Sequence, residues 1–257
     1  MTSPLLSRPG AVPADPPDAG VAAHYGDPLR EQRRLSEGAG VVDLSHRPVL
    51  RVSGPDRLTW LHSLTTQHLT ALAPGHGTTA LVLSPHGHVE HELDLVDDGE
   101  SVWLHVEPGS AAALAEFLDR MRFWSKVEVE AVSGAWAVVW EPIAQPHPVY
   151  VARVRPDGPL PGRDVFVPRE VLASYADQAG EVAGIWAYEA LRIAAHEPRA
   201  GLETDHRTIP HELGWLRDAV HLDKGCYRGQ ETVARVHNLG RPPRRLVLLH
   251  LDGSVEQ

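Results

Sequence analysis

The residues that most plainly offer chemistry lie in one short stretch, DKGCYRGQE, at 223–231. It holds Cys226, the only cysteine among 257 residues, between two glycines and beside the cations Lys224 and Arg228. Glycines permit a tight loop, and a helix starting at Gln230 would direct its N-terminal amides back toward that loop. Such surroundings favour the thiolate, the form that attacks electrophiles or ligates metals. A small cysteine that packs a turn explains the same spacing, so both interpretations stay open.

The charge of this region differs from that of the whole chain. The formal net charge is −10, which argues against indiscriminate nucleic-acid binding. Residues 223–245 nevertheless carry six basic residues against two acidic ones. An anionic ligand would seek this stretch, and direct tRNA binding is a weaker possibility. A solvated arginine-rich loop is the alternative.

Composition sets the class of protein. Hydrophobic residues make up 42% of the chain, enough for a large core, and no apolar run approaches the roughly 20 residues of a membrane-spanning helix. The N-terminus lacks the order of residues typical of a secretion signal. A single cysteine excludes an internal disulfide and a zinc site built from several thiolates. We therefore expect a cytoplasmic protein without membrane contact.

The pattern of apolar residues predicts strands in hairpins with helices between them, an α+β architecture. Residues 1–20 hold five prolines and little apolar content, which predicts a disordered tail. Asp27 and Pro28 mark the start of a helix. In VEHELDLV (89–96) alternate residues share one face, as in a half-buried strand that closes a hairpin with 78–84. Further expected strands lie at 48–54, 101–106, 126–132 and in 135–167, further helices start near 57, 111, 168, 185 and 230, and RRLVLLHL (244–251) opens a last strand.

Histidines cluster at HGHVEH (86–91), where two of them lie two residues apart. Zinc or iron would need a third ligand, and the first histidine is expected in the turn. With 16 histidines in the chain, chance clustering is the simpler explanation. We expect no resident metal.

The stretch DKGCYRGQETVAR closely resembles the K-G-C-Y-x-G-Q-E signature of the YgfZ-type folate-binding proteins. These are relatives of the aminomethyltransferase, or T protein, of the glycine cleavage system. Residues 24–67, 81–93 and 190–215 resemble successive parts of the same superfamily. The resemblance implies two interwoven ferredoxin-like subdomains at 21–240, with tetrahydrofolate or a derivative bound centrally. It also implies a C-terminal β-barrel that is mostly absent, with only its start at 241–257.

Three positions bear on activity. The aminomethyltransferases carry aspartate where this chain has Cys226, an Asp-Asp pair where it has His91-Glu92, and a pterin-binding glutamate where it has Ala194. These departures argue against transfer of an aminomethyl group and against a classical turnover enzyme. A folate-dependent one-carbon transferase or demethylase, with His91 or Glu92 moving a proton, stays as the alternative.

The YgfZ-type resemblance implies an accessory protein for iron–sulfur cluster assembly or repair, and thereby indirectly for tRNA modification. Cys226, supported by Lys224, would be its reactive group. One thiolate cannot hold a cluster, since such sites usually need four ligands. We therefore expect transient cluster contact or ligation shared with an assembly or client protein.

A folate site needs an aromatic or apolar slot for the pterin and cations for the glutamate tail. Trp186 or Tyr188 could stack on the ring, and Arg192 and Arg235 could pair with carboxylates. Trp186 could instead be core, and Arg192 could pair with Glu189 on its own helix. The full set of predicted folate contacts is Arg47, His91, Glu92, Trp186, Tyr188, Arg192, Tyr227, Gln230, Glu231 and Arg235.

Overall fold

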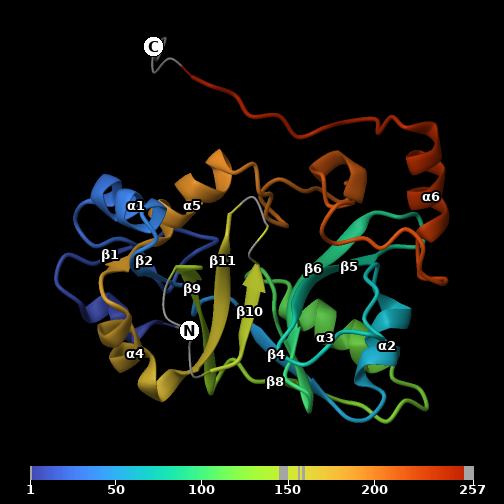
Figure 1. Ribbon diagram of the computed structural model, residues 1–257, viewed down its shortest axis with the longest axis horizontal. Helices are drawn as coiled ribbons and strands as arrows, with labels where there is room; N and C mark the ends of the chain where they lie inside the picture. The colour runs from blue at the N-terminus through green and yellow to red at the C-terminus, as the bar shows by residue number, and fades with distance from the viewer. Residues whose placement is uncertain (1, 145–149, 156, 158–159, 252–257) are drawn as a thin grey trace.

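Two five-stranded sheets form the frame of the protein in a computed structural model that describes residues 2–144, 150–155, 157 and 160–251 (Figure 1). The first sheet has the order β5-β6-β7-β4-β8 and the second β10-β11-β9-β3-β12. Neighbouring strands run antiparallel, except for the parallel pair β3 and β12. The strands are β3 (Val41–Asp43), β4 (Val49–Ser53), β5 (Gly77–Leu83), β6 (Val89–Asp97), β7 (Ser101–His105), β8 (Glu128–Ala131), β9 (Trp136–Pro142), β10 (Ala152–Arg155), β11 (Gly162–Pro168) and β12 (Val182–Ala183).

The two sheets are interwoven in the sequence. The chain lays down β3 in the second sheet, builds all five strands of the first, and then returns for β9 to β12. Helices α2 (Arg57–Leu64) and α3 (Ala111–Arg120) accompany the first sheet, whereas α1 (Pro28–Ser36), α4 (Leu172–Ala179) and α5 (Ile185–Ala194) accompany the second (Figure 1). The expected α+β class is therefore confirmed.

The β5–β6 hairpin shows how the sequence specifies its structure. Along β6, Leu93 and Leu95 are fully buried while Glu90 between the turn and the core is exposed, as strict alternation requires. The turn is held by Ser84, whose hydroxyl oxygen accepts the backbone N–H groups of His86 (3.2 Å) and His88 (3.1 Å). The hairpin is thus a rigid support for whatever lies beside it.

The N-terminal segment is ordered, contrary to the predicted disordered tail. A short 3-10 helix (Pro4–Ser7) precedes β1 (Val12–Pro13), which pairs with β2 (Ala22–His24). Leu5 is buried in the core of the second sheet, and the Ser3 hydroxyl donates to Asp43. A few specific contacts suffice to order a proline-rich segment, since proline loses little chain entropy on folding. Average composition does not register them.

The C-terminal part departs from the prediction in one respect. Helix α6 (Gln230–Leu239) forms as expected, after a 3-10 turn at Pro210–Leu213, but residues 241–251 contain no strand. A strand requires a partner for its N–H and C=O groups, and the predicted strand at 244–251 has none among the described residues. The domain limits at 21–240 and the start of a barrel stay predictions. No helix in the described ranges is long and apolar enough to cross a membrane.

Candidate functional site

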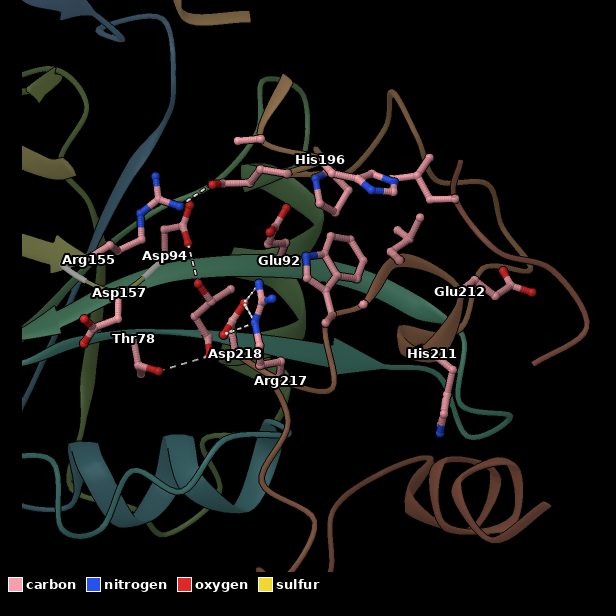
Figure 2. Close-up of a pocket in the computed structure, with 18 of the residues that line it drawn as sticks. Thr78, Glu92, Asp94, Arg155, Asp157, His196, His211, Glu212, Arg217 and Asp218 are labelled. Atoms are coloured by element: carbon pink, nitrogen blue, oxygen red, sulfur yellow. Dashed lines mark hydrogen bonds and ion pairs between the residues drawn. The ribbon is translucent and has the colours of Figure 1, made fainter. Parts of the chain in front are cut away.

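A cavity of about 820 Å³ lies where the two sheets meet (Figure 2). One wall comes from β5 and β6 of the first sheet and another from β10 of the second. The segment after α5 (195–198), the segment 211–218 and residues 245–246 complete it. Strands distant in sequence therefore bring their polar side chains into one enclosed space, which is the usual setting of a small-molecule site.

A buried guanidinium group forms part of the wall. Arg153 on β10 is 2% exposed, and its Nη atoms lie 2.7 Å from carboxylate oxygens of Asp94 and Asp164. Its Nε donates to the Thr78 carbonyl at 3.1 Å. Burial alone would raise the pKa of each carboxyl, but Arg153 holds the pKa of Asp94 below its ordinary value, and His105 with Arg153 does the same for Asp164. Both aspartates are therefore ionised at neutral pH.

Glu92 has the opposite protonation behaviour. Burial, followed by the nearby charges of Asp94 and Glu107, raises the pKa of Glu92 well above its ordinary value. The main opposing contact is the Ala200 backbone N–H, which donates to the carboxylate at 3.3 Å. Figure 2 shows this side chain pointing into the cavity beside Asp94. The site thus combines an acid that retains its proton with a carboxylate that has lost one, a pairing suited to proton transfer.

Unsatisfied polar atoms point to a ligand in the same cavity. Arg155 and Glu197 both line it and form an ion pair (Figure 2). Within the described part of the chain, Arg155 Nε and Glu197 Oε2 are nevertheless buried without a hydrogen-bond partner. Because an unpaired buried donor or acceptor is costly, a ligand that supplies the missing partners would bind favourably.

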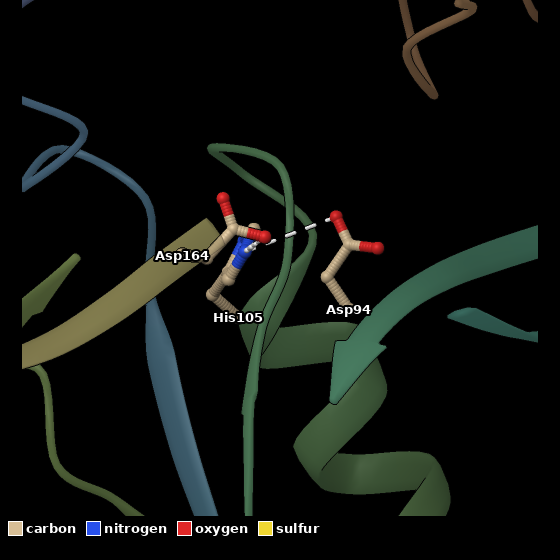
Figure 3. A group of neighbouring side chains, drawn as sticks. All are labelled: Asp94, His105 and Asp164. Atoms are coloured by element: carbon tan, nitrogen blue, oxygen red, sulfur yellow. Dashed lines mark ion pairs between the residues drawn. The ribbon is translucent and has the colours of Figure 1, made fainter. Parts of the chain in front are cut away.

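The cavity also borders a group of residues with the composition of a metal site. Asp94, His105 and Asp164 offer ligand atoms within 4.8 Å of one another (Figure 3). However, the guanidinium of Arg153 already bonds to both carboxylates. A divalent cation would have to displace a cation that is held by several contacts. We therefore interpret the group as a buried ionic network that joins the two sheets.

The signature loop places its two predicted reactive residues in different environments. Cys226 is exposed, whereas Lys224 is 6% exposed. The Lys224 ammonium donates to the carbonyls of His62, Thr65 (2.6 Å) and Gln67 (3.1 Å) at and beyond the end of α2. Burial lowers the pKa of Lys224 to about 8. All three of its donors are thus used to anchor the loop, so its predicted role at the thiol has no support from geometry.

Two glycines explain how the signature loop fits against the hairpin. Gly87 in the turn and Gly229 before α6 both have positive φ, +81° and +83°. A Cβ added at Gly87 would lie 2.6 Å from Cβ of Thr232, and one at Gly229 would lie 2.5 Å from the Ser84 carbonyl oxygen. The loop and the turn therefore touch backbone to backbone, which holds Cys226 at a fixed place on the surface. Cys226 is not among the residues that line the cavity.

The predicted pair His91-Glu92 is separated by the alternation of β6. Glu92 faces the cavity, but the His91 ring lies on the other face, where Nδ1 is 2.9 Å from the Ser110 hydroxyl at the start of α3. Burial lowers the pKa of His91 to about 4, so the ring is neutral at pH 7. The prediction that both act on one ligand is wrong for His91, because adjacent strand residues point to opposite faces.

Three other predicted contacts belong to the protein's own interior. Arg47 is buried, lies 3.0 Å from Glu107 and covers the ring of Tyr188 at 5.7 Å. Tyr188 is 3% exposed and packs edge-on against a tryptophan of β9. Arg192 bonds to Glu189 on its own helix at 2.6 Å, which confirms the alternative considered for it. These side chains are already satisfied, and none of them lines the cavity.

The remaining predicted contacts are dispersed. Trp186 is 54% exposed and contacts the ring of His24, so it is neither core nor cavity wall. Tyr227 is buried, and this raises the pKa of its hydroxyl to about 12. Gln230 donates to the Lys224 carbonyl at 3.3 Å. Glu231 and Arg235 line a different cavity, described below.

The cavity instead contains residues that the sequence did not single out. An aromatic, Trp215, and the adjacent pair Arg217 and Asp218 line the side opposite the strands. Together with Asp94, Arg155 and Glu197 they supply the aromatic surface, the cations and the acceptors that the prediction placed on other residues. The segment 190–215 was noticed for its resemblance, but nothing in it showed which side chains would turn inward.

The fold and the cavity define an α+β protein with interwoven sheets and a polar binding site between them. Residues 22–140 match the family model described as the GCVT N-terminal domain. The chain shares its fold with the glycine cleavage system aminomethyltransferase T from Bartonella henselae, with a TM-score of 0.77 over 91% of this chain and 73% of that one, at 18% identity. These matches support a place in the aminomethyltransferase folate-binding superfamily.

Curated relatives divide into two kinds. An Arabidopsis thaliana protein named as a chloroplastic transferase is 28% identical over 86% of this chain, and an iron–sulfur cluster assembly factor IBA57 homolog from Mycosarcoma maydis is 27% identical over 81%. The aminomethyltransferase of Symbiobacterium thermophilum is 26% identical over 88% of this chain and 71% of its own. The chain spans 58% and 56% of the length of the first two.

Proposed function

We propose that this chain binds a reduced folate in the cavity between the sheets and supports iron–sulfur cluster assembly or repair through Cys226. The observation that carries the proposal is the exposed cysteine, fixed by a glycine contact to the hairpin of a folate-superfamily fold. Relatives named as iron–sulfur assembly factors favour the same role. An effect on tRNA modification would be indirect, and a cytoplasmic location stays a prediction.

The residues of the cavity suit a pterin with an acidic tail. Its volume of about 820 Å³ lies within the range of small-molecule sites. Trp215 offers an aromatic surface, the neutral Glu92 can donate a hydrogen bond, and Arg155 and Glu197 have unpaired buried atoms. When bound, the folate would supply or accept the one-carbon unit. The chain's own contribution would be to orient it and to hold protons at Glu92.

The position of Cys226 bears on how the thiol would act. Because the side chain is exposed and lies outside the cavity lining, its partner would be another protein or a cluster carried by one. A single thiolate cannot complete a cluster's ligand set, so the contact would be shared or transient. Folate and thiol would then act at separate places on one surface of the chain.

Two measurements test the proposal. Titration with tetrahydrofolate, followed by intrinsic fluorescence of the seven tryptophans, should give saturable binding that Glu92→Gln or Trp215→Ala weakens. Cys226→Ser should lose complementation in an iron–sulfur enzyme maintenance assay while it retains folate binding. If the serine variant complements fully, the thiol has no such role.

A folate-dependent one-carbon transferase is the second candidate. The observation in its favour is the split protonation of Glu92 and Asp94 within the cavity. Relatives named as aminomethyltransferases point the same way. Methylene transfer from a folate donor at an enzymatic rate, lost in Glu92→Gln but retained in Cys226→Ser, would favour this candidate over the accessory role.

A further inference from the structure

A second cavity of about 820 Å³ lies between the turn of the β5–β6 hairpin and helix α6. Residues 85–88 of the turn form one wall, the first two turns of α6 form another, and residues 207–209 and 243–244 close it. Among the residues that line this cavity, Glu212 is shared with the first one. The two spaces therefore lie on either side of the 3-10 turn at Pro210–Leu213.

Two cations of this cavity have no partner. Within the residues that the structure describes, the guanidinium groups of Arg207 and Arg235 take part in no ion pair or hydrogen bond, and both side chains are exposed toward the cavity they line. A third, Arg244, bonds to Asp205 and to Glu212 at 2.8 Å each. The third cation is thus neutralised, while the first two are available to a ligand.

The walls of the cavity are held at a fixed separation. Ser84 fixes the turn through the amides of His86 and His88, and both imidazole rings line the space. Gly87 lies so close to Thr232 on α6 that an added Cβ would be 2.6 Å from the threonine Cβ. The turn and the helix cannot approach or separate freely, so the cavity is formed before any ligand arrives. Preorganisation of this kind favours binding.

The chemistry of the lining indicates the class of ligand. The floor includes Ile209 and Val236, which are 6% and 9% exposed, so apolar surface lies beside the cations. Three guanidinium groups face two carboxylates, Glu212 and Glu231, which leaves a net positive charge in an acidic protein. Guanidinium groups match the geometry of phosphate oxygens in a bidentate manner. An anion with an apolar or ring-containing part fits both features.

We propose that this second cavity binds a small phosphorylated molecule, with Arg207 and Arg235 holding the phosphate and the apolar floor contacting the rest. The site is separate from the cavity proposed for folate. Cys226 and the second cavity are attached to the same loop and helix, so a bound ligand would lie near the surface that presents the thiol. The proposal goes beyond the folate and thiol roles and does not depend on them.

Titration calorimetry with inorganic diphosphate tests the proposal. The wild-type chain should show saturable binding at physiological salt. Arg207→Gln and Arg235→Gln should each weaken it about tenfold, as loss of one charge-assisted contact predicts. Arg241→Gln is the matched control, since Arg241 is exposed, loses the same charge and lines neither cavity. All three variants change exposed side chains, so folding should be unaffected.

Three results would overturn the site. One is the absence of saturable diphosphate binding, and another is an equal loss in Arg241→Gln, which would mean diffuse attraction to a basic surface. The third is binding of single-stranded RNA that diphosphate cannot displace. Tetrahydrofolate binding should be unchanged in the Arg207→Gln/Arg235→Gln double variant. If diphosphate binds and tetrahydrofolate does not, the folate proposal fails and this site stands.

Discussion

Replacing Arg153 by methionine should expose how the two sheets are held together. Arg153 is 2% exposed, and its ion pairs with Asp94 on β6 and Asp164 on β11 connect the first sheet with the second. Methionine fills a similar volume but leaves both carboxylates without their cation. Both would then be buried charges with little compensation, because His105 lies 3.8 Å from Asp94 and 3.4 Å from Asp164.

The expected loss is large. Removal of one partner from a buried ion pair costs about 3–5 kcal/mol, against a total stability of roughly 5–15 kcal/mol for a typical domain. Arg51→Met is the matched control, since the pair of Arg51 with Glu130 is more than one third exposed on both sides. Loss of such an exposed pair should cost about 1 kcal/mol or less. The contrast isolates burial from charge.

The pH dependence should change sign. In the wild type the pKa values of Asp94 and Asp164 are lowered, so their ionisation contributes stability above the ordinary carboxyl pKa, and this is lost as the pH falls through it. Without Arg153, burial dominates and raises the pKa of both groups above the unfolded value. The destabilisation of Arg153→Met should therefore be largest near pH 7 and should shrink on acidification toward pH 4.

Urea unfolding followed by tryptophan fluorescence at pH 7 and pH 4.5 measures both effects. The variant Arg153→Met/Asp94→Asn/Asp164→Asn should recover most of the lost free energy of unfolding, because it removes the uncompensated charges. It also keeps the test informative if the single variant does not fold. A loss below about 1 kcal/mol at pH 7, or no recovery in the triple variant, would refute the reasoning.

Three further predictions concern Glu92, Gly87 and Lys224. The raised pKa of Glu92 means that stability is lost as the pH rises through it, so Glu92→Gln should be more stable than the wild type at pH 7.5, with the difference in thermal midpoint vanishing below pH 4. Gly87→Ala should cost about 1–3 kcal/mol, since alanine is strained at φ +81° and would contact Thr232; an unchanged urea midpoint would contradict the backbone contact. Lys224→Met should cost about 2–4 kcal/mol by leaving three carbonyls at the end of α2 without a donor, whereas the exposed Lys126→Met should cost almost nothing in the same unfolding assay.

Local patterns predicted the elements well. Alternation along 89–96 predicted β6 and its buried face, and Asp27 followed by Pro28 predicted the start of α1, where the Asp27 carboxylate accepts the Arg30 N–H at 3.0 Å. These features depend on neighbours within a few residues. Local reasoning failed at Leu5, because the contacts that order the N-terminal segment come from strands more than a hundred residues away.

The site followed the opposite course. The sequence by itself determined the α+β class, the hairpin and the loop that carries an exposed Cys226. Only the tertiary structure decided that Glu92 and not His91 faces the cavity, that Lys224 anchors α2, and that Arg155 and Glu197 meet there. The cavity is built from strands of two interwoven sheets, so which side chains turn inward depends on how the sheets pack. That packing is set by burial and charge compensation across the whole chain.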